Sequence, residues 1–512
     1  MPAVSTPGWI TQGISSAASD GLFGPITAFV IGIALHLSLF RRGEWDVSAH
    51  KIPLGLFVCQ LTLFFYALFA TSQKETALWV VTKLSTSLLG GLTISILVYR
   101  ARFHRLGKFP GPFAARLSTW YIISLRTRYP DTFNAVRDLN QRYGDIVRTG
   151  PTEISITHPD AINIVHSGRS RCTKRPWYSL LHPFISLFHI REKAEHTRRR
   201  KPWELAFRPE EYHCVRDNKK HLIMEANDSS NALTGVLSQV VWLISFIEKI
   251  PGLNKDINAF IEFSHKQVSN RERMETPSHC DVFSWLKEDF DERGTQTHQS
   301  RLDLAADASL VLFAGSGTVA ITIIGTLYFL ATASPHHLET VREEIDSLDK
   351  FDSRSLSQLP HLNAIIKETP RLHYPALTGF QRQTPLEGIQ IADTYIPGNV
   401  NVRIPFYTLF RDERNFEAPE EFIPERLTNK PHLVRNDSSF TPFLIGPYTC
   451  PGKGLALVQV RHVVGEIVRR YDFNWAPGVD PGQYWASRTD GFIMGLGPLN
   501  LVFEDRMSRL SS

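Results

Sequence analysis

The stretch FLIGPYTCPGKGLAL, Phe443 to Leu457, places a single cysteine between glycines, directly before a long segment with apolar residues at helical spacing. Gly446 permits a tight turn, and Gly452 lets the backbone approach another group closely. The pattern predicts that Cys450 lies at a helix N-terminus, where unpaired N–H groups and the positive end of the helix dipole favour a thiolate. A buried, inert cysteine is the alternative, and the spacing alone does not exclude it.

An ordered set of motifs favours the reactive interpretation. Phe443, Gly446, Cys450 and Gly452 resemble the F-x-x-G-x-x-x-C-x-G haem-binding loop of the cytochrome P450 family, in which a cysteine thiolate is the axial ligand of the iron. The resemblance implies haem b as cofactor, Cys450 as its metal ligand and catalytic residue, and the other three residues as cofactor contacts. It covers roughly 109–503 and implies the cytochrome P450 fold, mainly α with small β-sheets.

Two upstream segments resemble the family motifs whose side chains hold the haem-binding loop in place. HLNAIIKETPRLHYPA, His361–Ala376, is similar to the K helix, with Glu368 and Arg371 in its E-x-x-R positions, which share one helix face. FIPERL, Phe422–Leu427, resembles the segment whose arginine, here Arg426, completes a buried Glu–Arg–Arg cluster. The E-x-x-R spacing alone is weak, because three further pairs have it and are expected to be surface pairs: Glu195/Arg198, Glu339/Arg342 and Glu466/Arg469.

The segment 303–335 resembles the long I helix that crosses the distal face of the haem. Ala314, Gly315 and Thr318 match its A-G-x-[DE]-T-T run, which implies haem contacts for the first two and a catalytic proton relay through Thr318. Gly317 stands where the family has an acidic residue, so the usual carboxylate is missing. Without the resemblance, the segment is an apolar helix whose glycines would also suit a close helix crossing.

Cations for the haem propionates are expected from two regions. In EHTRRRKPW, Glu195–Trp203, His196 and Arg200 match C-helix positions that often contact the cofactor, and Arg382 matches another such position. Tyr448 replaces the arginine or histidine that many relatives have. Electrons enter the family's haem from the thiolate side, so the resemblance implies docking of an acidic NADPH–cytochrome P450 reductase, with these candidate cations: Arg198–Lys201, Lys453, Arg461, Arg469 and Arg470.

The first hundred positions predict a membrane region. Apolar stretches at 21–40, 52–72 and 77–99 each approach the roughly 20 residues needed to cross a bilayer. The alternative is one span with two interfacial or core helices. KFPGPF, Lys108–Phe113, interrupts any continuing helix, so we expect a membrane region of about three transmembrane helices over 1–108 and a haem-thiolate catalytic domain over 109–512. Within the latter, YGDIVRTGPTEISITHP, Tyr143–Pro159, predicts short strands.

Charge and cysteine spacing set the orientation and the partners. The cations Arg41, Arg42 and Lys51, and those at 100–108, predict cytosolic loops, a luminal N-terminus and a cytosolic catalytic domain, typical of a multi-pass protein of the endoplasmic reticulum. The five cysteines show neither disulfide nor zinc spacing, as expected in a reducing compartment. A net charge of +5 is too small to indicate nucleic-acid binding.

The resemblance implies a fungal microsomal monooxygenase that uses O2 and NADPH-derived electrons to oxidise a lipophilic small molecule, such as a terpenoid in secondary metabolism. Candidate cavity residues are Phe313, Ala314, Leu377, Thr378 and Phe492. Because Gly317 lacks the acid, two alternatives stay open: a haem-thiolate isomerase or dehydratase that needs no reductase, and a haem-binding relative with impaired catalysis.

Overall fold

The computed structural model describes residues 22–42, 45, 49–179, 182–205, 235, 238–240, 243, 255–273, 282–292 and 298–506. Gly21 at the start of the first predicted span, and the cysteines Cys214 and Cys280, lie outside these residues. The described part is mainly helical with small β-sheets, which confirms the predicted fold class. Its three described cysteines are free thiols.

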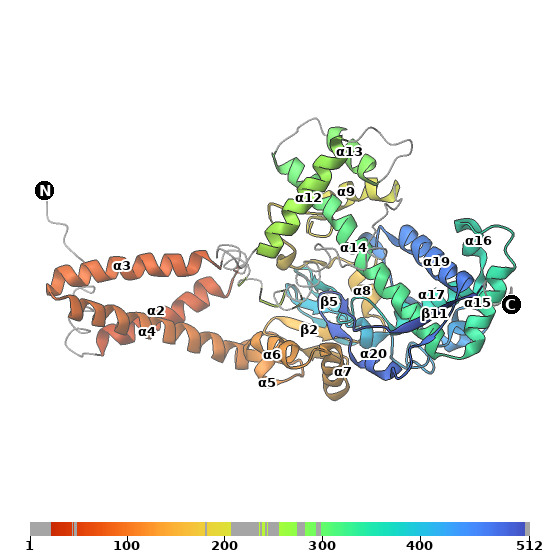
Figure 1. Cartoon of the computed structure of the whole chain (residues 1–512). Helices are drawn as coiled ribbons and strands as arrows, with labels where there is room; N and C mark the ends of the chain where they lie inside the picture. The colour runs from red at the N-terminus through yellow and green to blue at the C-terminus, as the bar shows by residue number, and fades with distance from the viewer. Residues whose placement is uncertain are drawn as a thin grey trace.

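Three long apolar helices project from the body of the molecule as a stalk (Figure 1). They are α2 (Phe23–Leu35, continued by the π-turn η1, His36–Phe40), α3 (Lys51–Thr71) and α4 (Lys74–Val98, continued by η2, Tyr99–Phe103). Their bounds agree with the predicted spans to within a few residues. Large apolar side chains face outward from α3, and Phe69 is 86% exposed. Such a surface suits a lipid environment.

Small residues let α2 and α4 pack closely. A Cβ on Gly32 would collide with the Leu88 carbonyl, and a Cβ on Gly91 would collide with the Phe29 carbonyl. Only glycine fits at these two positions, because any side chain would push the helices apart. Close backbone approach through small residues is the usual way in which helices associate in lipid.

The helical body is organised around α14 (His298–Thr332), which is about 50 Å long at 1.5 Å per residue. By length and hydropathy α14 could also cross a membrane, but it packs against α12, α17 and α19 inside the body. Its apolar character therefore reflects burial among helices. The surrounding helices are α9 (Lys193–Leu205), α12 (Lys255–Arg273), α13 (Val282–Glu292), α15 (Pro335–Asp346), α16 (Ser353–Gln358), α17 (Pro360–Leu372) and α19 (Lys453–Arg470).

A five-stranded sheet lies between the stalk and these helices, in the order β1-β2-β7-β4-β3. Its strands are β1 (Ile146–Arg148), β2 (Glu153–Ile156), β3 (Thr173–Lys174), β4 (Gln381–Gln383) and β7 (Asn401–Arg403). The β2–β7 pair is parallel and the other pairs are antiparallel. Strands β1 and β2 confirm the prediction for 143–159. Short antiparallel pairs join β5 (Ile389–Ile391) to β6 (Thr394–Ile396), β8 (Tyr471–Trp475) to β11 (Leu501–Asp505), and β9 (Thr489–Asp490) to β10 (Met494–Gly495).

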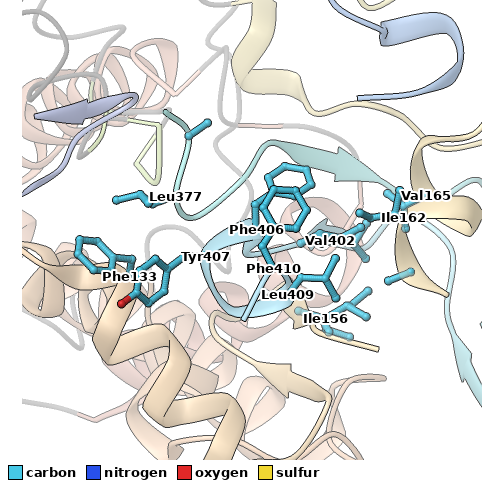
Figure 2. Packing of buried hydrophobic residues seen from close by; sticks show 14 of the residues in the cluster. Phe133, Ile156, Ile162, Val165, Leu377, Val402, Phe406, Tyr407, Leu409 and Phe410 are labelled. Atoms are coloured by element: carbon cyan, nitrogen blue, oxygen red, sulfur yellow. The ribbon is translucent and has the colours of Figure 1, made fainter. Parts of the chain in front are cut away.

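The main apolar core packs the sheet against short helices, and Figure 2 shows part of it. Phe133 from α7 (Thr132–Tyr143) contacts Tyr407 from α18 (Phe406–Leu409), with ring centroids 4.5 Å apart. The remaining helical elements are α5 (Phe113–Leu117), α6 (Trp120–Arg128), α8 (Ala161–His166), α20 (Pro481–Ala486) and the 3-10 turns η3 (Pro176–Ser179), η4 (Pro424–Leu427), η5 (Pro431–Leu433), η6 (Asp437–Ser439) and η7 (Gly446–Tyr448).

The predicted boundary at Lys108–Phe113 is non-helical as far as Pro112, between η2 and α5, which begins at Phe113. Gly111 has φ +149°, and a Cβ there would collide with the Arg148 carbonyl. The chain therefore passes directly over β1 at this glycine, and the Arg148 N–H donates to the Pro110 carbonyl at 2.7 Å. These contacts fix the position where the stalk meets the sheet.

Candidate active site

The Cys450 loop is held by a turn that requires glycine. Gly446 has φ +71°, and a Cβ at this position would collide with the His166 carbonyl of α8. Beyond the turn, the Cys450 N–H donates to the Phe443 carbonyl at 2.8 Å, which closes the loop. Gly452 is the N-cap residue of α19, so the predicted place of Cys450 at a helix N-terminus is confirmed.

The Cys450 sulfur lies close to the N-terminus of α19. Burial raises the pKa of its thiol, and this effect exceeds the lowering by the nearby N–H groups of Gly452 and Lys453 and by the charge of Arg200. The helix end lowers the pKa of the thiol, as predicted, but desolvation outweighs it, so the net pKa is raised and the expected thiolate is not favoured. A bound metal cation removes the thiol proton, because only the thiolate ligates.

The predicted residues of α9 lie directly beside this loop. Arg200 Nη1 donates to the Thr449 carbonyl and, at 3.5 Å, to the Pro447 carbonyl. The His196 ring meets the Tyr448 ring edge to face, with centroids 5.0 Å apart. Burial and neighbouring cations lower the pKa of His196 to about 3, so its imidazole is neutral at pH 7.

A buried group of cations surrounds the ring of Tyr448. The charged groups of Lys174 and Arg382 lie 4.9 and 4.8 Å from its centroid. Both side chains are buried, and among the described residues neither forms a salt bridge. The Tyr448 hydroxyl and Arg382 Nε have no hydrogen-bond partner there either. Burial and the charges of Arg382 and Arg200 lower the pKa of Lys174 far below its usual value. The site is built to receive an anion.

Lys174 is the residue of this group that the sequence did not reveal. Its Nζ donates to the carbonyls of Leu187 and Phe188 at 3.2 and 2.8 Å, and Arg382 donates to the Tyr178 hydroxyl at 3.2 Å. Lys174 and Arg382 are Cα partners in the β3–β4 ladder, so pairing of two strands that are distant in sequence creates the site. The basic, aromatic composition of 173–178 was the only available signal.

The predicted I-helix residues occupy consecutive turns of α14, which is continuous there. The side of Gly315 is open, with no atom within 4 Å of a built Cβ, and Ala314 and Ser316 are exposed although α14 crosses the body. The Thr318 hydroxyl donates to the Ala314 carbonyl at 2.8 Å. A Cβ on Gly317 would lie 2.9 Å from Ile493 Cδ1, so a side chain at this position would require the end of the Ile493 side chain to shift.

The predicted Glu–Arg–Arg cluster is brought together and fully enclosed. Glu368 Oε1 accepts from Arg371 Nε at 3.0 Å and Nη2 at 2.8 Å, and from Arg426 Nε at 3.0 Å. Both guanidinium groups also donate to loop carbonyls; Arg371 reaches Phe410 at 3.0 Å, and Arg426 reaches Glu417 at 2.9 Å. The cluster thereby fixes the segment that leads to the Cys450 loop.

The candidate cavity residues fall into three groups. Thr378 and Phe492 line a pocket together with Arg126, Trp177, Phe380 and Gln381. Phe492 packs against Trp177 with ring centroids 5.7 Å apart, and Arg126 Nη2 donates to the Thr378 hydroxyl at 3.2 Å. Leu377 is instead 1% exposed within the main apolar core. Ala314 and Phe313 lie on α14 and are not part of this pocket's lining.

The expected surface cations are only partly available for docking. Arg199 is buried against Asp307, and Arg469 and Arg470 both pair with Glu466. Lys201 and Lys453 are exposed. Of the expected surface pairs, Glu195/Arg198 and Glu466/Arg469 form. The prediction of a Glu339/Arg342 pair is wrong, because Arg342 instead pairs with Asp472 of β8 at 2.5 Å.

Comparison with known proteins agrees with this geometry. Residues 210–498 match the family Cytochrome P450. The cytochrome P450 monooxygenase phqL of Penicillium fellutanum is 56% identical over 98% of each chain. The monooxygenase FCK2 of Fusarium pseudograminearum is 37% identical over 93% of this chain and 97% of its own. Tryprostatin B 6-hydroxylase of Aspergillus fumigatus is 30% identical over 94% of this chain and 96% of its own.

The chain belongs to the cytochrome P450 family, and it is a haem-thiolate monooxygenase, an oxidoreductase. The described residues fit haem b. The buried cations around Tyr448 have the charge that two propionates require, and the open side of α14 at Ala314 and Gly315 leaves space for a flat ring. The Cys450 sulfur, directly before the N-terminus of α19, has the chemistry of an iron ligand.

Proposed function

We propose that Cys450 is the axial ligand and that the chain is a membrane-anchored hydroxylase of a lipophilic secondary metabolite. The observation that carries the proposal is the position of Cys450, directly before the N-terminus of α19 and beside a buried set of cations. Bound haem would supply the activation of O2. Residues 1–108 would form the membrane region and 109–512 the catalytic domain.

The protein residues would hold and orient the cofactor. Arg382, Lys174 and His196 would meet the propionates, while Arg200 fixes the carbonyls of the Cys450 loop. Ala314 and Gly315 would face the ring, and Phe443, Gly446 and Gly452 would set the loop against it. Glu368, Arg371 and Arg426 would keep the loop in place, because removing one member leaves a buried charge unpaired.

Thr318 would relay a proton without the usual acid. Its hydroxyl donates to its own helix, which leaves its oxygen lone pairs to accept from water or substrate. Ser316 is exposed on the same helix, two residues before Thr318, and offers a second hydroxyl. Proton delivery through two hydroxyl groups and ordered water needs no carboxylate at Gly317.

Electrons would come from NADPH through a membrane-bound reductase of the endoplasmic reticulum. The exposed Lys453 lies at the start of α19, close to the Cys450 loop, and Lys201 lies at the end of α9. An acidic partner surface would meet these charges, so the rate of reduction should fall as ionic strength rises. The three apolar helices of the stalk would place both proteins on one membrane surface.

The relatives indicate the class of substrate. The name of the Aspergillus fumigatus relative states that it hydroxylates tryprostatin B at position 6. We therefore propose that the enzyme hydroxylates a lipophilic fungal metabolite, which enters through the pocket lined by Thr378 and Phe492. Tryprostatin B is the first compound to test, a terpenoid library is the second, and metabolite comparison in a deletion strain would identify the natural substrate.

A reduced carbon-monoxide difference spectrum tests the ligand. We expect the thiolate-type Soret band in the wild type and in Cys59→Ala, whose cysteine is exposed on α3. The band should be lost in Cys450→Ala. A wild-type protein that binds haem without this band, or a Cys450→Ala protein that keeps it, would disprove the assignment.

The glycine at position 317, where the family has an acidic residue, favours a second candidate, a haem-thiolate isomerase or dehydratase. Such an enzyme turns over without reductase. Substrate-dependent NADPH oxidation and O2 uptake, matched by hydroxylated product, would exclude it. Product formation in the absence of NADPH and reductase would support it against the hydroxylase.

A further inference from the structure

A cluster of metal-ligand side chains lies where three elements meet, on the body of the molecule. His337 comes from the first turn of α15, His361 from the first turn of α17, and Glu425 from η4. Their ligand atoms all lie within 4.8 Å of one another. His337 Nδ1 is 3.1 Å from His361 Nε2 and 3.7 Å from Glu425 Oε1.

We propose that His337, His361 and Glu425 form a binding site for Zn²⁺, separate from the haem. In a tetrahedral zinc site with bonds of about 2.05 Å, the ligand atoms lie about 3.3 Å apart. The distances from His337 Nδ1 to His361 Nε2 and to Glu425 Oε1 differ from this value by only a few tenths of an ångström. Two imidazoles and one carboxylate form a common zinc ligand set, in which water takes the fourth position.

The surroundings favour a cation over three ordinary polar side chains. His337 Nδ1 and His361 Nε2 face each other at 3.1 Å, and both present a lone pair to a cation when each neutral ring carries its proton on the other nitrogen. The charged and titratable groups around them are Glu425, which attracts a cation, and His336 and Lys430. The carboxylate of Glu344 accepts the N–H groups of His361 and Leu362, which offsets the positive end of α17.

The site would connect two helix ends to the segment that holds the haem loop. Glu425 directly precedes Arg426, whose guanidinium binds Glu368 and the Glu417 carbonyl. A zinc ion would therefore join η4 to α15 and α17. We expect Zn²⁺ to raise the thermal midpoint of the haem-loaded enzyme, because a ligand that binds only the folded state stabilises it.

Zinc titration of the haem-loaded, full-length protein without a histidine tag tests the proposal. We expect one Zn²⁺ per haem in the wild type, at least tenfold weaker binding in His361→Gln and in Glu425→Gln, and no change in His336→Gln. His336 is the matched control, since it is exposed on α15 next to His337 and outside the cluster. The carbon-monoxide band of each variant shows that it is folded.

X-ray absorption at the zinc edge identifies the ligands independently of the haem iron. Two imidazole nitrogens and one carboxylate oxygen in the wild type would support the site. Equal zinc affinity in the wild type, His361→Gln and Glu425→Gln would overturn it, as would a zinc-edge spectrum without imidazole. In either case the histidines would form only the hydrogen bond that their 3.1 Å separation already permits.

Discussion

Lys174 and Arg382 place two positive charges directly opposite each other across the β3–β4 ladder. Like charges at such positions are destabilising, and burial raises the cost further. The Tyr448 ring lies within 5 Å of both groups, which offsets only part of this cost. An arrangement that is unfavourable alone becomes favourable when an anion binds, so these residues are suited to hold the haem propionates.

Lys174→Met should loosen the haem. Methionine keeps the length and apolar stem of lysine but removes a charge-assisted hydrogen bond, which contributes about 1.5–3 kcal/mol. We expect the haem to transfer to apomyoglobin at least tenfold faster than from the wild type. Lys193→Met is the matched control, because Lys193 also donates to a carbonyl, that of Ser170, but lies outside the group of cations around Tyr448. Equal transfer rates for both variants would count against a propionate role for Lys174.

Residues within short motifs were predictable, whereas residues that depend on strand pairing were not. Cys450 and Gly446 belong to one loop, so a single short motif contained both of them. Glu368 and Arg371 share one helix face, and Arg426 follows as the next motif. Lys174 becomes a candidate only when β3 pairs with β4, which no local pattern reports. The direction of the Cys450 pKa was also missed, because burial depends on the whole fold.

At the scale of elements, one buried carboxylate connects α9, α14 and the turn before α9. Asp307 on α14 binds Arg199 of α9 at 2.5 Å and accepts the Leu187 N–H at 2.5 Å. Arg199 also lies 3.3 Å from Asp303. This network orients α9, and with it Arg200 and His196, relative to the helix that crosses the body.

Asp307→Asn should destabilise this junction. The substitution leaves the buried Arg199 charge without its main partner, at a cost of about 3–5 kcal/mol. We expect a thermal midpoint several degrees lower, measured as loss of the carbon-monoxide band on heating. Glu195→Gln is the control, since the exposed Glu195/Arg198 pair contributes at most about 1 kcal/mol. Equal midpoints for the two variants would show that Asp307 is not a structural link.

Sequence periodicity located elements better than it located their partners. The three apolar spans and strands β1 and β2 were predictable, because apolar length and alternation are local properties. The predicted Glu339/Arg342 ion pair does not form, although its spacing suits a helix. Asp472 of β8 lies within reach of Arg342 and binds it instead. Only the packing of α15 against distant segments decides which pair forms.

At the scale of the whole molecule, buried neutral histidines should limit stability in acid. Burial lowers the pKa of His189 and His373 to about 3, whereas the unfolded chain titrates near 6.5. Below pH 6.5 the unfolded state therefore binds protons that the folded state does not. Stability is lost as the pH falls from 6.5 towards 3, by about 2 kcal/mol per histidine at pH 5.

The measurement is the thermal midpoint of the haem-loaded protein at pH 7.5 and at pH 5. The wild type should lose stability over this range, and His373→Gln, which can keep a hydrogen bond to the Tyr484 hydroxyl, should lose less. His189→Gln, next to Ser186, is a second and independent variant. If the thermal midpoint of both variants falls between pH 7.5 and pH 5 by as much as that of the wild type, these histidines are excluded as the cause.

The stalk and the positions of its cations predict how the whole chain sits in a membrane. Arg41 and Arg42 follow η1, Lys51 is the first residue of α3, and Arg100, Arg102 and Arg105 follow α4, where the stalk joins the sheet. Because cytosolic loops retain positive charge, three crossings place the N-terminus in the lumen and the catalytic body in the cytosol. An Asn-x-Ser/Thr acceptor added before residue 1 should be glycosylated in microsomes, whereas one inserted between Arg42 and Lys51 should not. Glycosylation of the inserted acceptor, or of neither, would contradict three crossings and would favour a single span with two helices lying on the membrane surface.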